Sequence, residues 1–406
     1  MIIDLPKTTS ASVSKKLVRL RNDVGAMTLG RVLTLIIVVD DHQADEIIEA
    51  ANDASRQHPC RIIVVVAGNR RGANRMDAQI RVGGDAGASE VVVLRLFGAL
   101  ANHGQSVVVP LMLPDSPVVA WWPHEAPTDL RKDPIAQMAQ RRITDSAESP
   151  NPKAALKRLA KVYAPGDTDL AWTRITLWRG LLAAALDGPP FEPVTEAVVA
   201  GATDSPSSDL LAAWLAQVLK VPVKRVRTKG GTGVMSVRLE RASGPVDLVR
   251  PDGAVATLSQ PGQPDRRISL KRRGVAECLA DELRRLDADE VYAETLTHGL
   301  ARLGAATKTA SEAAADGEAP SVPDSRRLAA RLARRPSTKE ASEMVTAPPA
   351  PDGGDTATVK KATAHKLAAR ATPREKELAS TAEAAEQKAA TKGSARKKAA
   401  AQPATR

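Results

Sequence analysis

Two short runs of almost uninterrupted apolar residues constrain the fold of this chain most strongly. Arg31–Val39 reads RVLTLIIVV and Arg61–Ala67 reads RIIVVVA. Strands that are apolar and β-branched at nearly every position are typical of parallel sheets covered on both faces. Gln43–Gln57, between the two runs, places its isoleucines on one side of a predicted helix. The sequence therefore predicts a right-handed βαβ unit.

Further elements extend this unit into a larger domain. The apolar stripe that follows Ser12 predicts a first helix with a plausible N-cap. Additional strands are predicted at Met76–Val82, Glu90–Leu96, Val107–Leu113 and Val118–Trp122. We interpret residues 1–150 as an N-terminal α/β domain with a mixed sheet.

The following 150 residues have a different pattern. Helices are predicted at Asn151–Tyr163, Asp169–Leu186, Asp209–Leu219, Val275–Leu286 and Asp289–Leu303, and alternating strands at Val221–Thr228, Val234–Ala242, Val246–Arg250 and Ala254–Leu258. Pro189-Pro190 and the polar stretch Gly201–Ser208 suggest a domain boundary. We expect a helical connecting segment over residues 151–200 and an α+β domain with antiparallel strands over residues 201–303.

The composition changes after Leu303. No Phe, Trp or Tyr follows Tyr292, and residues 304–406 contain 19 Lys and Arg against 12 Asp and Glu, so +7 of the formal net charge of +11 lies there. A segment so poor in large apolar residues cannot offset the entropy lost on ordering. We therefore predict a disordered basic tail. Its acid-free end, Lys388–Arg406, is either a weak contact for polyanions or a solvated tail with no obligatory partner.

Catalytic and cofactor motifs are missing from the sequence. The glycine-rich segments Lys229–Gly233 and Gly83–Gly87 each join two predicted strands, so we interpret the first as a hairpin turn and neither as a phosphate-binding loop. Asp40-Asp41-His42 follows the first buried strand, where a dinucleotide site requires glycines. The six histidines show no metal-ligand spacing. We expect no catalytic residues, no cofactor and no metal.

An alternative remains open at the strand ends. Asp40, Asp41 and Asp145 follow predicted strands, and ligands of open α/β sheets bind at the carboxyl ends of strands. An enzyme acting on a sugar phosphate or nucleotide would place its ligand there. A capping role for Asp145-Ser146 before a helix explains that pair equally well.

The two cysteines, Cys60 and Cys278, lie too far apart in sequence to suggest a metal motif or a disulfide framework, and a redox role stays open. The N-terminal residues lack the pattern of a signal peptide, and the longest apolar runs are strand-sized. We therefore expect a cytoplasmic protein that does not enter the membrane.

Four of the five tryptophans fall in two clusters, Ser116–Pro123 and Asp169–Arg179. Adjacent tryptophans at the end of a strand should point to opposite faces of the sheet. Trp and Arg are also the residues that most often anchor protein interfaces, although packing between the domains explains them as well. Our candidate partner-binding residues are Trp121, Trp122, Pro123, Trp172, Arg174, Trp178 and Arg179.

The two arginines of the second cluster should differ in their surroundings. On a continuous helix, Arg174 and Arg179 would lie about 140° apart, so both cannot share the tryptophan face. We expect Arg174 to be held inside by a carboxylate such as Asp169 or Asp145. Arg179 is expected to reach solvent or a partner.

Four segments in this order carry a family resemblance. They are Leu113–Trp122 (LPDSPVVAWW), Ile143–Ser146 (ITDS), Asp169–Arg174 (DLAWTR) followed by Trp178-Arg179, and Leu211–Leu215 (LAAWL). Together they resemble the glucose-6-phosphate dehydrogenase assembly protein family, OpcA, over most of Met1–Leu303, with the tail outside the resemblance.

The resemblance implies a non-catalytic cytoplasmic protein of actinobacteria or cyanobacteria. Such a protein promotes assembly of glucose-6-phosphate dehydrogenase, or activates it allosterically, in the oxidative pentose phosphate pathway. The family has no established catalytic residues to carry over. The alternatives are the sugar-phosphate or nucleotide enzyme described above and a nucleic-acid-binding protein that depends on its basic tail.

Overall fold

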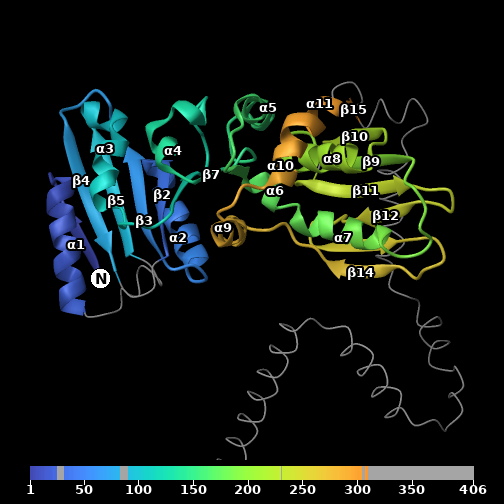
Figure 1. The fold of residues 1–406 in the computed structure, drawn as a ribbon, viewed down its shortest axis with the longest axis horizontal. Helices are drawn as coiled ribbons and strands as arrows, with labels where there is room; N and C mark the ends of the chain where they lie inside the picture. The colour runs from blue at the N-terminus through green and yellow to red at the C-terminus, as the bar shows by residue number, and fades with distance from the viewer. Residues whose placement is uncertain (25–31, 83–89, 230, 304–306, 310–406) are drawn as a thin grey trace, which may run out of the picture. The chain divides into compact units, whose positions relative to one another are not determined.

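The structure is a computed structural model that describes residues 1–24, 32–82, 90–229, 231–303 and 307–309. All of these residues belong to one compact unit. They form one sheet of eight strands and one of seven, with helices packed against them (Figure 1).

The eight-stranded sheet has the order β1-β4-β5-β3-β2-β6-β7-β8. Its strands are β1 (Ile2–Leu5), β2 (Leu33–Asp40), β3 (Cys60–Ala67), β4 (Arg75–Arg81), β5 (Glu90–Phe97), β6 (Val118–Trp122), β7 (Arg141–Thr144) and β8 (Asp167–Asp169). The six strands from β5 to β8 in this order are parallel, whereas β4 pairs antiparallel with both β5 and β1. The predicted mixed sheet and its βαβ unit are confirmed.

Helices cover both faces of this sheet, as the continuous apolar strands require. Their bounds are α1 (Ser10–Val24), η1 (Asp41–Gln43), α2 (Ala44–Ser55), η3 (Gly98–Asn102), α3 (Gly104–Val108), η4 (Val109–Leu111), η5 (Leu130–Lys132), α4 (Pro134–Met138) and α9 (Val275–Arg284). Helices α2 and α9 share one buried cluster with Leu35 and Trp121, while α1, α3 and α4 share the other with Ile36 and Trp122. Helix α9 therefore packs against the first sheet although it lies far from that sheet in the sequence.

The seven-stranded sheet has the order β14-β13-β12-β11-β9-β10-β15. Its strands are β9 (Glu196–Ala202), β10 (Val223–Thr228), β11 (Val234–Glu240), β12 (Val246–Val249), β13 (Val255–Ser259), β14 (Arg266–Ser269) and β15 (Thr307–Thr309). Strands β14 to β9 in this order are antiparallel as predicted, but β9, β10 and β15 pair in parallel. The associated helices are α5 (Pro152–Val162), α6 (Leu170–Thr173), α7 (Thr176–Leu186), α8 (Pro206–Leu219), α10 (Glu290–Glu294), the π-helical turn η6 (Thr295–Gly299) and α11 (Leu300–Arg302).

The predicted strand Val107–Leu113 is wrong. The chain there forms α3 and η4. Val107, Val108 and Leu111 are buried while Val109 and Pro110 are exposed, which is a helical period rather than the alternation of a strand. An apolar run of this length does not by itself distinguish a helix from a strand.

Two further predictions were wrong. Lys229–Gly233 is not a hairpin turn, because β10 and β11 do not pair with each other but flank β9 on either side. Asp169–Leu186 is not one helix, since Asp169 ends β8 and a break at Ile175 separates α6 from α7. Gly201 lies within β9, where an added Cβ would lie 2.3 Å from the Ser208 Oγ atom.

Residues 151–200, predicted as a helical connection, contain α5, α6 and α7 together with β8 and most of β9. The domain boundaries at residues 150 and 200 stay predictions. The segment Gly83–Gly87 and residues 304–306 and 310–406 of the predicted tail lie outside the described residues, and Thr307–Thr309 forms β15. None of the described helices is long and apolar enough to cross a membrane.

Candidate functional site

The four clustered tryptophans lie in the interior of the protein. The exposed fractions of Trp121, Trp122, Trp172 and Trp178 are 0, 2, 1 and 2 %, and Pro123 is also buried. Trp121 and Trp122 belong to different buried clusters, which confirms that they point to opposite faces of the sheet. In this structure the indoles supply packing rather than open surface, and their part in partner binding stays a prediction.

Arg174 and Asp145 form a buried ion pair at the carboxyl end of β7. The Nη1 and Nη2 atoms of Arg174 donate to Oδ1 and Oδ2 of Asp145 at 2.7 and 2.6 Å. Both side chains are almost fully buried. Burial raises the pKa of Asp145, and the guanidinium opposes that shift. The prediction that a carboxylate holds Arg174 inside is confirmed, and Asp145 does not cap a helix.

Asp169 organises the loop next to this pair. Its carboxylate accepts hydrogen bonds from the Thr144 hydroxyl at 2.7 Å, from the Ser146 N–H and hydroxyl at 2.9 and 2.8 Å, and from the Ala171 N–H at 2.9 Å. It thereby caps α6 and fixes the chain after β7. Burial, together with the charge of Asp145, raises the pKa of Asp169 to about 6.

Arg179 lies flat against Trp172. Its Cζ atom is 3.6 Å from the ring centroid, a cation–π geometry, and its Nη2 atom donates to the Thr176 hydroxyl at 3.3 Å. The Trp172 Nε1–H donates to Asp289 at 2.8 Å, and Asp289 also caps α10. Trp172 and Arg179 are seven residues apart, a spacing that on a continuous helix puts two side chains about 20° apart, so the sequence spacing alone already places them on one face.

Helix α9 is tied to the same region by charged groups that the sequence analysis did not single out. Glu282 accepts hydrogen bonds from Arg141 of β7 and from the Thr173 hydroxyl of α6. Cys278 lies on this helix, and burial raises the pKa of its thiol to about 12. Cys60 is likewise buried. Nothing in the sequence of this predicted helix indicated that Glu282 would contact Arg141 and Thr173.

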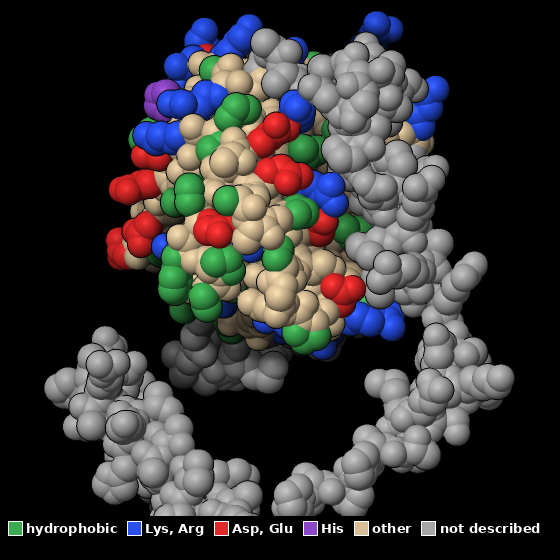
Figure 2. All heavy atoms as spheres, turned by 90° about the vertical axis from the view of Figure 1, so that its right-hand side faces the viewer, with side chains coloured by type: hydrophobic (Ala, Val, Ile, Leu, Met, Phe, Trp, Pro, Cys, Tyr) green, Lys and Arg blue, Asp and Glu red, His purple; other side chains and the backbone are tan. Residues whose placement is uncertain are grey.

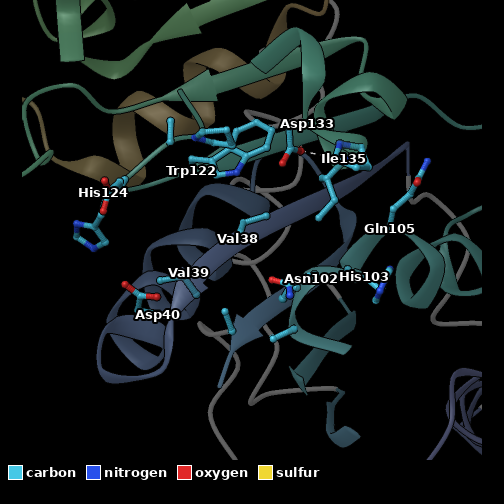
Figure 3. A pocket seen from close by; sticks show the side chains of 18 of the residues that line it. Val38, Val39, Asp40, Asn102, His103, Gln105, Trp122, His124, Asp133 and Ile135 are labelled. Carbon is cyan, nitrogen blue, oxygen red and sulfur yellow. Dashed lines mark hydrogen bonds between the residues drawn. The ribbon is translucent and has the colours of Figure 1, made fainter. Parts of the chain in front are cut away.

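A pocket of about 570 Å³ opens at the carboxyl ends of β2, β3 and β6 (Figure 3). Of the three aspartates predicted near strand ends, Asp40 lines it. Asp41 instead forms an ion pair with Arg95 at 2.9 Å, and Asp145 is engaged by Arg174. Among the described residues, no group of three or more His, Cys, Asp or Glu side chains could hold a metal ion.

The order β5-β3-β2-β6-β7-β8 repeats the 3-2-1-4-5-6 order of dinucleotide-binding sheets. In such sheets the first strand leads into a glycine-rich turn and a helix that binds the diphosphate. Here β2 leads into the short helix η1, and the first turn of α2 carries Asp45 and Glu46. The topology is present without its phosphate-binding loop.

Two family models match the chain. Residues 51–161 match the glucose-6-phosphate dehydrogenase subunit N-terminal domain, and residues 165–296 match the corresponding C-terminal domain. Together the two regions span more than half of the sequence. The chain belongs to the glucose-6-phosphate dehydrogenase assembly protein family, OpcA. A comparison with curated proteins gives no match.

Several solved structures are similar at low identity. Glucose-6-phosphate 1-dehydrogenase from Mycobacterium avium is 12% identical over 69% of this chain and 94% of its own, with a TM-score of 0.34. A Gfo/Idh/MocA family oxidoreductase from Vibrio cholerae is 9% identical over 75% of this chain and 100% of its own, with a TM-score of 0.35. These scores are too low to support any argument about activity.

Proposed function

We propose that this protein is a non-catalytic assembly factor or allosteric activator of glucose-6-phosphate dehydrogenase, acting in the cytoplasm in the oxidative pentose phosphate pathway. The match of both family domains across residues 51–161 and 165–296 carries the proposal. The missing phosphate-binding loop after β2 supports the non-catalytic part, because a dehydrogenase fold of this strand order holds its dinucleotide there.

Arg179 is the residue that we propose as the contact with the dehydrogenase. It is partly exposed, and no carboxylate of the described residues forms an ion pair with it. Burial lowers its pKa to about 10, so it keeps its charge at neutral pH. A guanidinium already held on the Trp172 ring loses little rotamer freedom when a partner carboxylate binds.

The other candidate residues hold Arg179 and its surroundings in place. The Trp172 ring contacts Arg179, and Arg174 joins the end of α6 to Asp145. The Cζ atom of Arg250 lies 5.1 Å from the ring centroid of Trp178. Trp121, Trp122 and Pro123 fix the end of β6 in the core. We propose that these six residues position the interface rather than contact the dehydrogenase.

The face shown in Figure 2 gives no support to a nucleic-acid-binding protein. On the face shown in Figure 2, acidic, basic and hydrophobic side chains are mixed. Nucleic-acid-binding proteins gather Lys and Arg into a basic stripe or patch. Weak polyanion binding through the residues beyond 388 is a separate proposal, tested by its loss when the tail is removed.

The test mixes the purified full-length protein with its cognate dehydrogenase. We expect no turnover of the protein alone on NADP⁺ with glucose 6-phosphate, and a saturable change in the rate or mass of the dehydrogenase, followed by absorbance and light scattering. Arg179→Ala should weaken this effect. The matched control is Arg75→Ala, which removes another arginine stacked on an aromatic ring. The Cζ atom of Arg75 lies 4.1 Å from the ring centroid of Phe97. No effect of the protein on rate or mass would refute the proposal.

A further inference from the structure

The pocket at the carboxyl ends of β2 and β6 lies where ligands of open α/β sheets bind. Strand β2 connects through α2 to β3 on one side, while β6 pairs with β2 on the other, so the strand order reverses between β2 and β6. This is the switch point of such a sheet. Its volume of about 570 Å³ is within the range of small-molecule sites.

The floor of the pocket is apolar. Val38 and Val65 contribute from two adjacent parallel strands, and Trp122 and Ile135 close the floor from β6 and α4. Trp122, Val65 and Ile135 are 2, 4 and 7 % exposed, so only their edges, together with Val38, form the apolar part of the lining against which a ring could pack.

Polar side chains surround this floor. Figure 3 shows Asp40 and His124 on one side of the pocket and Asn102, His103 and Gln105 across from them. Within the described part of the chain, none of these five side chains takes part in a hydrogen bond or ion pair. They are therefore free to bind groups of a ligand.

The charge around Asp40 selects against phosphate. Asp40 and Asp41 end β2 and begin η1, and Asp45 and Glu46 occupy the first turn of α2. Asp41 and Asp45 pair with Arg95 and Arg81. The pocket lining itself carries three carboxylates, Asp40, Glu125 and Asp133, against the one guanidinium of Arg70, so its net charge repels a phosphate. The Asp40 carboxylate, which has no hydrogen-bond partner among the described residues, can accept hydrogen bonds from vicinal hydroxyls of a ligand.

We propose that this pocket binds an unphosphorylated nucleoside, with its base on the apolar floor and its ribose 2′- and 3′-hydroxyls donating to Asp40. Because the floor is apolar, it packs a base better than a sugar, which favours a nucleoside over a free sugar. The proposal is independent of the contact with the dehydrogenase.

Calorimetric titration of the full-length protein with adenosine tests the proposal. We expect one site per chain, with binding by AMP and NAD⁺ at least about tenfold weaker because of the carboxylates. 2′-Deoxyadenosine and 3′-deoxyadenosine should each bind about tenfold more weakly than adenosine, since each loses one hydrogen bond to a charged group.

Asp40→Asn is the decisive variant. Asp40 is exposed and its side chain caps nothing, so the fold should tolerate the change. Affinity for adenosine should fall about tenfold and the discrimination against AMP should shrink. Asp41→Asn, next in sequence and outside the pocket, is the control and should bind like the parent. Ala101→Phe, which fills the pocket, should abolish binding.

Several outcomes would overturn the inference. These are absence of adenosine binding at about 10 mM, AMP or NAD⁺ binding as tightly as adenosine, and Asp40→Asn binding like the parent. Glucose binding in place of adenosine would assign the pocket to a sugar instead and would equally refute the nucleoside.

Discussion

Arg174 and Arg179 lie five residues apart, yet their guanidinium groups meet opposite kinds of surroundings. Arg174 is held by both oxygens of the buried Asp145, whereas Arg179 rests on the Trp172 ring at the edge of solvent. The guanidinium of Arg174 is paired inside the fold, and that of Arg179 is the one that we propose for contact with a partner.

This difference predicts a clean separation of variants. Arg174→Ala leaves the Asp145 charge buried and unpaired, so we expect the free energy of unfolding to fall by about 3–5 kcal/mol. Arg179→Ala should cost about 1 kcal/mol, the value of a partly exposed cation–π contact. Urea unfolding of the two variants measures both. Equal losses would show that Arg179, too, is a structural residue.

Asp169 predicts a pH dependence of stability. Its pKa in the folded protein is about 6, above the value of about 3.9 in an unfolded chain. The folded state therefore holds this proton more tightly, and the stability that Asp169 contributes is complete below pH 4 and lost as the pH rises through 6.

The size of this contribution is on the order of 3 kcal/mol. Asp169→Asn cannot titrate, so the free energy of unfolding of the variant, relative to the parent, should increase between pH 4 and 6. Urea unfolding across this range checks the slope. A parallel pH profile for the two proteins would contradict the raised pKa.

Among single residues, the sequence predicted that Arg174 is buried, and Asp145, its partner, was one of the two carboxylates proposed for it. The sequence did not identify the contact between Arg179 and Trp172, although residues seven apart share one face of an unbroken helix. Nor did it predict that Asp169 ends β8 and caps α6, or that Ile175 leaves helical geometry before α7 begins.

Among the helices and strands, those with a strong local pattern were predictable. The runs in β2 and β3 and the apolar side of α2 were read directly from the sequence. Strand β8 has the sequence DTD and no apolar residue, so only its parallel pairing with β7 makes it a strand. The parallel pairing of β9 and β10 is likewise set by long-range contacts that no local pattern encodes.

Strand β15 provides a test at the scale of one element. Thr307–Thr309 pairs in parallel with Arg225–Arg227 at the edge of the seven-stranded sheet. A chain ending after Thr309 should melt like the parent. A chain ending after Leu303 should lose about 1 kcal/mol of stability, or a few degrees in Tm. Differential scanning calorimetry compares them, and equal melting temperatures would show that β15 contributes nothing.

On the scale of the whole molecule, charged contacts bind the C-terminal helices to the first sheet. Glu282 of α9 reaches Arg141 of β7, and Asp289 at the start of α10 reaches Trp172 of α6. The contacts converge on the short helix that precedes Arg179. A partner that binds Arg179, as we propose, would therefore contact a segment that both sheets hold in place, as a rigid interface requires.

The proposed activation must obey linkage. If the protein raises the affinity of the dehydrogenase for glucose 6-phosphate by favouring one of its states, glucose 6-phosphate must tighten binding of the protein by the same factor. We therefore expect a lower Kd for the complex, measured by calorimetry, when glucose 6-phosphate is present. Arg179→Ala should raise the Kd under both conditions without changing their ratio. A ratio of one, with assembly still promoted, would mean that the protein acts as a scaffold for assembly and does not select a state with higher affinity for substrate.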